Sequence, residues 1–191
     1  MSIYPLEKNT SGIVTLAFLG ALGIVVRLFI RIPIIPGLLE LTPGFLFSEL
    51  GGVVGGIPGG LLVGAIVGIG GAIAGGEIPL LPLIGNMALG FGTGYAVHIT
   101  KNRDGLKYAL LAILGGGLIG GFIPSMTLFA GVGVPFETTF LYALMDMIQA
   151  LFWAVIAVVL ERKIIRPILG HYLYPNMQES ELLLEASEDD R

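Results

Sequence analysis

Long apolar stretches alternate with short polar or proline-containing segments along the whole chain. Because a helix needs about 20 mostly apolar residues to cross a bilayer, these stretches predict membrane-spanning helices. We place them at residues 13–30, 41–56, 61–75, 83–99, 106–123 and 139–165. The sequence therefore predicts an all-α fold, an integral membrane bundle of six transmembrane helices within residues 1–175. Residues 176–191 form an acidic tail that we expect to be flexible and cytoplasmic.

The composition supports a membrane protein, since 54% of the residues are hydrophobic and only 13% are charged. A soluble domain carries roughly a quarter charged residues. Glycine accounts for 30 of the 191 residues and lies mostly inside the apolar stretches. Small residues four apart let helices approach closely, so the series Gly52, Gly56, Gly60, Gly64 and Gly68 predicts contacts between helices.

The basic residues predict how the bundle lies in the membrane. With six spans both termini are on one side, and that side holds seven basic residues: Lys8, Lys101, Arg103, Lys107, Arg162, Lys163 and Arg166. The other side holds only Arg27 and Arg31. The positive-inside rule then places both termini in the cytoplasm. Three proline-containing loops, 31–40, 76–82 and 124–138, face outward, where they either cover a ligand or merely connect helices.

A one-sided polar face marks the last predicted span. At about 100° per residue, Tyr142, Asp146, Gln149 and Trp153 share one side of a helix that begins at the outer surface. Ionisable residues inside a span are costly and usually face a cavity or a partner. We interpret this face as the wall of an outward-open pocket, with Asn86 of the fourth span opposite. The alternative is that the aromatic residues fill the core and Asp146 bonds to a neighbouring helix.

Glu49 is the second carboxylate inside a span, and it lies deeper than Asp146. Two interpretations are open: a substrate-binding group, or an internal partner for Ser48 or Arg27. Ala17, Gly20 and Ala21 of the first span form a smooth patch. This patch either packs inside the bundle or docks onto another membrane protein.

Several functions receive no support from the sequence. A phosphate-binding loop is absent, so the chain does not itself use ATP. His98 and His171 have no second metal ligand nearby, and we predict no metal site, no cofactor and no enzymatic activity. The net charge is −4, and the acidic residues are concentrated in the tail. The sequence does not indicate a nucleic-acid partner.

Four stretches together resemble the substrate-binding S components of energy-coupling factor transporters. They are Ala17-Phe-Leu-Gly-Ala21, which matches an A-x-x-x-A docking motif, Leu41-Thr-Pro-Gly-Phe45, Gly55-Gly-Ile-Pro-Gly-Gly-Leu-Leu-Val-Gly64 and Gly85-Asn-Met-Ala-Leu-Gly90. The resemblance covers residues 12–166. The chain departs from the nickel and cobalt branch, because Met1-Ser-Ile-Tyr-Pro5 lacks that branch's metal-binding histidine.

The resemblance implies a multi-pass protein of the prokaryotic plasma membrane that binds a vitamin or related micronutrient with high affinity. It implies that a transmembrane coupling subunit and two cytoplasmic ATPase subunits supply the energy, with Ala17 and Ala21 as the docking surface. The implied pocket contains Asn86, Tyr142, Asp146, Gln149 and Trp153, and Glu49 is a further candidate. The polar groups of the wall favour a neutral or cationic heteroaromatic substrate, although Arg31 can reach an anionic one from its loop.

Two competing functions remain at this point. A self-contained ion-coupled carrier or channel would use Glu49 and Asp146 for protons or cations. A structural assembly protein would instead use its glycine faces to hold partners together.

Overall fold

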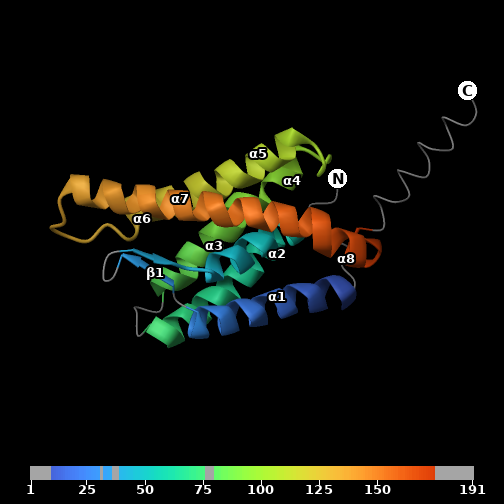
Figure 1. Cartoon of the computed structure of the whole chain (residues 1–191), viewed down its shortest axis with the longest axis horizontal. Coiled ribbons are helices and arrows are strands. Elements are labelled where there is room, and N and C mark those ends of the chain that lie inside the picture. The colour runs from blue at the N-terminus through green and yellow to red at the C-terminus, as the bar shows by residue number, and fades with distance from the viewer. Residues whose placement is uncertain (1–9, 31, 36–38, 76–79, 175–191) are drawn as a thin grey trace, which may run out of the picture.

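The protein is a bundle of long apolar helices with one small β-hairpin (Figure 1). The computed structural model describes residues 10–30, 32–35, 39–75 and 80–174. Lys8, Arg31 and the acidic tail lie outside these residues. The elements are α1 (Thr10–Phe29), β1 (Ile32–Ile35), β2 (Leu39–Leu41), α2 (Gly44–Gly75), α3 (Leu80–Gly94), α4 (Ala96–Ile99), α5 (Leu106–Gly115), η1 (Gly116–Phe122), α6 (Ile123–Thr127), α7 (Phe136–Leu160), η2 (Glu161–Ile165) and α8 (Arg166–Leu173).

Five helical segments in the described part of the chain are long and apolar enough to cross a membrane, rather than the six predicted. They are Thr10–Phe29, Gly44–Ile73, Leu80–Ile99, Leu106–Thr127 and Phe136–Leu173. The difference lies in α2, which contains the predicted span 61–75 and all of the predicted span 41–56 except its first three residues. No loop separates these spans, because the chain changes direction at a single residue.

That residue is Gly56, whose φ of 63° and ψ of −159° are not helical. A side chain would strain this backbone conformation, and glycine adopts it freely. A Cβ built on Gly51 would lie 2.5 Å from Cβ of Val63 and 3.0 Å from the Gly59 carbonyl oxygen. Residues on the two sides of Gly56 therefore face each other, so α2 consists of two arms that pack side by side.

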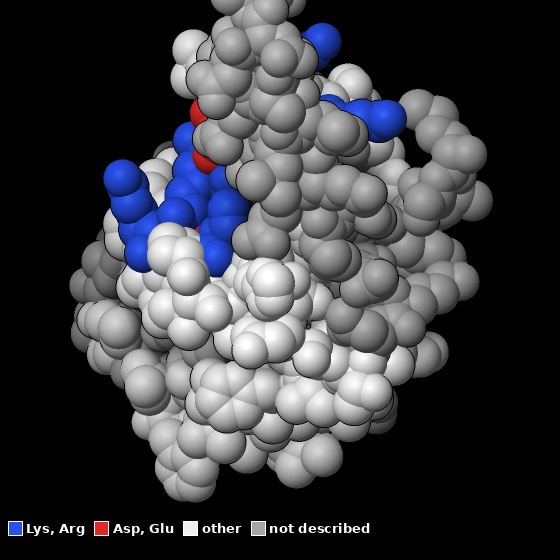
Figure 2. Space-filling view, turned by 90° about the vertical axis from the view of Figure 1, so that its right-hand side faces the viewer, with Lys and Arg blue, Asp and Glu red and all other residues white. Residues whose placement is uncertain are grey.

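The two ends of the bundle differ in character. The start of α1 and the end of α8 lie at one end, while the β1–β2 hairpin and the connection from α6 to α7 lie at the other (Figure 1). Lysine and arginine side chains gather at the end that holds α8 (Figure 2). This basic end includes the turn before α5, which contributes Arg103, and the segments η2 and α8, which contribute Arg162 and Arg166.

A buried polar network holds the basic end together. It forms because the break in α2 leaves backbone carbonyls that side chains can bind. Pro58 has no N–H, and the Ile57 N–H donates to Nε2 of His98 at 3.4 Å. The carbonyls of Val53 and Val54, one turn earlier, receive other donors. Arg103 donates to them at 2.7 and 3.2 Å. Arg103 thus serves as a side-chain cap for the first arm.

Two tyrosines complete this cap. The Tyr108 hydroxyl donates to Val53 O at 3.1 Å, and the Tyr174 hydroxyl donates to Val54 O at 3.2 Å. Burial raises the pKa of the Tyr174 phenol, so the hydroxyl keeps its proton at neutral pH. Arg103 also faces the carboxylate of Glu161 at 3.7 Å, and both side chains are almost fully buried.

The predicted glycine contacts join α2 to α3. A Cβ on Gly60 would collide with the Gly90 carbonyl oxygen, and one on Gly64 would collide with the Asn86 carbonyl oxygen. A Cβ on Gly68 would lie 2.5 Å from Cα of Leu83. The second arm of α2 therefore runs against α3 with backbone touching backbone, which confirms internal packing for these positions. The same contact fixes Asn86 in the position described below.

Candidate functional site

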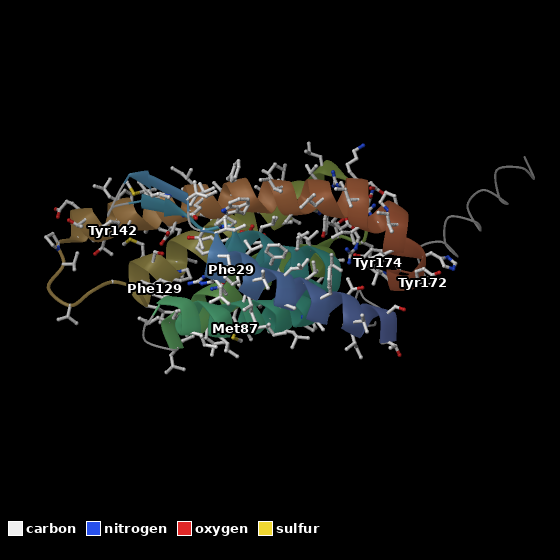
Figure 3. The ribbon with its side chains drawn as sticks, turned by 60° about the horizontal axis from the view of Figure 1, so that its bottom comes forward. Phe29, Met87, Phe129, Tyr142, Tyr172 and Tyr174 are labelled. Carbon is white, nitrogen blue, oxygen red and sulfur yellow. The ribbon has the colours of Figure 1, made fainter. Side chains whose placement is uncertain are left out.

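Two adjacent cavities lie toward the end of the bundle that carries the β-hairpin. The first has a volume of about 440 Å³, and the second about 380 Å³. Small-molecule pockets typically have roughly 300–1,000 Å³, so either cavity suits a metabolite. Both are bordered by Ser125, Phe129 and Asp146. Figure 3 shows Phe129 and Tyr142 near this end, far from Tyr174 at the basic end.

Asp146 of α7 lies where the two cavities meet. The Ser125 hydroxyl of α6 donates to one of its carboxylate oxygens at 2.5 Å. The backbone of α7 can approach η1 here because η1 carries Gly121, where a Cβ would lie 2.7 Å from the Asp146 carbonyl oxygen. One carboxylate oxygen is thus oriented by the protein. The carboxylate is half-buried and remains at the cavity surface.

Asn86 of α3 borders the first cavity, opposite α7, as predicted. Its side-chain oxygen accepts a hydrogen bond from Ser48 at 2.9 Å, and its side-chain nitrogen donates to Pro82 O at 2.8 Å. These two bonds fix the amide, which is buried. Since an amide nitrogen has two hydrogens, one donor of Asn86 is left over after these bonds.

Gln149 and Tyr142 border the second cavity together with Asp146. The backbone N–H of Thr42 donates to the Gln149 side-chain oxygen, which ties the segment after β2 to α7. Tyr142 lies one turn before Asp146 in α7 and is exposed. The structure thus brings together four residues of the predicted site, namely Asn86, Tyr142, Asp146 and Gln149, around the two cavities.

Trp153 and Glu49 do not border either cavity, contrary to their predicted place. Trp153 follows Gln149 by one turn, and at this depth the same face of α7 is buried inside the bundle. Its ring packs edge-on against Phe152, with ring centres 5.0 Å apart. Glu49 is fully buried and faces η1, where a Cβ on Gly116 would lie 3.1 Å from its carboxylate. Among the described residues the Glu49 carboxylate has no hydrogen-bond partner, so the proposed pairing with Ser48 or Arg27 is wrong.

Sequence reasoning missed Arg27 as a cavity residue. It borders the first cavity from α1, together with Phe45 and Leu89. Its position at the end of the first span is typical of an interfacial arginine, so the sequence pattern did not indicate that Arg27 borders a pocket. Ser125 and Phe129 were also missed, because they lie just outside the last turns of a predicted span.

Ala17 and Ala21 border neither cavity and lie on the outward face of α1. Both are exposed, together with the neighbouring Phe18. The opposite face of α1 packs against α2 through Leu16, Gly20 and Gly23. In this structure Ala17 and Ala21 are therefore available for docking, whereas Gly20, the third residue of the predicted patch, packs inside the bundle against Ile66.

The fold is shared with an S component of an energy-coupling factor transporter, which is the family that the sequence resembles. One solved structure with this fold is the 2.1 Å crystal structure of the S component for biotin from an ECF-type ABC transporter. The two structures superpose with a TM-score of 0.60 at 18% sequence identity, and the alignment covers 80% of this chain and 91% of the other. No protein-family model matches the sequence, and no curated protein matches it either.

Proposed function

We propose that this protein is the substrate-binding subunit of an energy-coupling factor transporter in a prokaryotic plasma membrane, and that it takes up a vitamin or related micronutrient. The observation that carries the proposal is the pair of cavities around Asp146. A fold shared with the biotin S component supports it. Biotin is one candidate substrate, since it combines polar ring groups with a size suited to the cavities.

The proposed topology has six membrane crossings, counting the two arms of α2 separately, with both termini in the cytoplasm. The basic end then faces the cytoplasm, in agreement with the positive-inside rule. The cavities and the β-hairpin then face outward, which is where a nutrient arrives. We further propose that a transmembrane coupling subunit docks onto the exposed Ala17 and Ala21 of α1, and that two ATPase subunits supply the energy.

The rival function is a self-contained carrier that moves ions through Glu49 and Asp146. Asp146 lies at the cavity surface, whereas Glu49 is enclosed by α2 and η1 and borders neither cavity. Among the described residues, these positions do not form the continuous polar route that ion coupling requires. The geometry therefore favours capture of a substrate over conduction.

The proposal predicts that a small molecule copurifies with the wild-type protein and is lost when Asp146 is replaced by leucine. Removing the carboxylate leaves the substrate's donors without a partner in an apolar cavity, which costs about 1.5–3 kcal/mol or more. The compound is released by heating and identified by liquid chromatography and mass spectrometry. Glu137→Gln, which changes an exposed carboxylate in the first turn of the same helix, serves as the control.

Equal amounts of compound in the wild-type and Asp146→Leu preparations would contradict the proposal.

The purified compound is then added to liposomes that contain the wild-type protein alone. We expect binding without accumulation inside the liposomes, because the energy source is absent. Accumulation without any ATPase would instead establish a carrier.

A further inference from the structure

The two cavities share part of their wall. Asp146, Ser125 and Phe129 border both of them. The Asp146 carboxylate accepts the Ser125 hydroxyl, which fixes one of its oxygens. The Phe129 ring lies over Gly85 of α3, where a Cβ would lie 2.9 Å from the tip of the ring. The cavities therefore adjoin each other, and their shared boundary carries a carboxylate, a hydroxyl and an aromatic ring.

The first cavity is mostly apolar and lies inside the bundle. Asn86 hydrogen-bonds to Ser48 and to Pro82 O, which leaves one amide donor. Arg27 also borders this cavity, but it already interacts with another residue of the protein. The rest of the described wall, apart from the shared boundary, is apolar or glycine: Phe45, Leu81, Pro82, Leu89, Gly120 and Gly121. This wall suits the apolar part of a molecule.

The second cavity is more polar and lies nearer the solvent. Gly131, Val134 and Tyr142, which border it, are all exposed. Thr139 and Tyr142 contribute hydroxyl groups, each of which can donate and accept a hydrogen bond. Thr42 and Gln149 add further polar groups to the wall. This wall suits a polar group of a molecule, close to the outward end of the bundle.

We infer that one substrate molecule occupies both cavities, and that the substrate is an elongated amphiphilic compound. Its apolar ring or chain lies in the first cavity, and its polar end lies in the second. Between them, an N–H or O–H group donates to Asp146 at the shared boundary. This inference rests on the proposed function and narrows its substrate class. A uniformly polar metabolite would fill only the second cavity.

The difference between the two walls also fixes the orientation of the substrate. Burial of an apolar group as large as a leucine side chain increases affinity by about 10- to 100-fold. A polar end in the first cavity would lose its hydrogen bonds to water and find few partners there, which opposes binding. The polar end therefore stays near the exposed residues of the second cavity.

Filling each cavity separately tests the inference. Leu81→Trp narrows the first cavity and Met145→Trp narrows the second. Their matched controls are Leu80→Trp and Ile148→Trp, which add the same bulk at neighbouring positions that are 62% and 63% exposed and border neither cavity. The compound extracted from the wild-type protein is titrated into each substrate-free variant by isothermal titration calorimetry. We expect both cavity variants to bind this compound at least about 10-fold more weakly, and both controls to bind it like the wild type.

A second pair of variants changes polarity with little change in volume, so it decides the question if a tryptophan variant fails to fold. Leu81→Asn places an amide in the apolar wall and should weaken binding of the same compound by about 10-fold. Thr139→Val removes a hydroxyl from the polar wall and should weaken it by about 2- to 10-fold. Circular dichroism establishes that each variant is folded.

Three results would overturn the inference and leave the proposed function intact. The first is weaker binding in the variants of one cavity only, which would confine the substrate to that cavity. The second is two bound molecules per protein in native mass spectrometry, and the third is an extracted compound without an apolar part. A wild-type protein that retains and binds no compound at all would instead reject the proposed function together with the inference.

Discussion

Replacing Glu161 by glutamine is expected to lower the free energy of unfolding by about 3–5 kcal/mol, because it leaves the buried Arg103 without its counter-charge. The Glu161 side chain is fully buried and lies 3.7 Å from Arg103, which is also buried. Arg166 donates two hydrogen bonds to the same carboxylate, at 2.6 and 3.0 Å. Glutamine keeps the size of the side chain and removes the charge, so the loss measures the electrostatic role of Glu161.

Asp104→Asn is the matched control, because Asp104 also pairs with Arg166, at 2.6 Å, and is 68% exposed. An exposed pair of this kind contributes at most about 1 kcal/mol. Both variants are unfolded by titration with sodium dodecyl sulfate in mixed micelles, and helix content is followed by circular dichroism. Similar stability losses for the two variants would show that the buried network does not hold the basic end together.

Replacing Gly60 by alanine is expected to destabilise the bundle by at least about 2 kcal/mol, since overpacking of a tight interior costs about 1–3 kcal/mol. The added methyl group meets the carbonyl oxygen of Gly90, which belongs to the backbone and cannot rotate away. To accommodate the methyl group, α2 and α3 have to separate. Asn86, one turn of α3 before Gly90, then shifts as well, so substrate affinity should fall together with stability.

Gly55→Ala tests the same substitution in the first arm of α2. Its methyl group would meet only the flexible end of Leu16, at 3.1 Å. Alanine also favours a helix over glycine by about 0.5–1 kcal/mol, which offsets the small rearrangement of Leu16. We expect this variant to remain within about 1 kcal/mol of the wild type in the same titration. A milder effect at Gly60 than at Gly55 would contradict the backbone contact between α2 and α3.

The parts of the site that lie along one helix could be predicted from the sequence. Tyr142, Asp146 and Gln149 border the cavities because helical spacing alone places them on one face of α7. Trp153 has the same spacing, yet it lies below the cavity floor. The spacing of residues along a helix predicts which side of the helix a side chain faces. The depth at which a cavity ends depends instead on the side chains that the neighbouring helices place there.

Contacts between distant segments could not be predicted in the same way. Arg103 reaches the carbonyls of Val53 and Val54 because Gly56 turns the chain back within one residue, and the sequence pattern suggested two spans separated by a loop. Arg27 borders the cavity because Gly71, more than forty positions later, leaves space for its guanidinium. Such relations depend on how the helices pack, and hydropathy along the chain contains no information about them.

We propose that the cavities beside Asp146 open to the outside of the cell and hold a small molecule. The chain has no cysteine, so a single cysteine introduced at Met145, in the wall of the second cavity, can be followed by labelling with a membrane-impermeant maleimide in intact cells. Ala157→Cys, in the buried core, is the control. We expect labelling of Met145→Cys from outside, protection by the copurifying compound, and no labelling of Ala157→Cys. Labelling of Met145→Cys only after the membrane is permeabilised would contradict it.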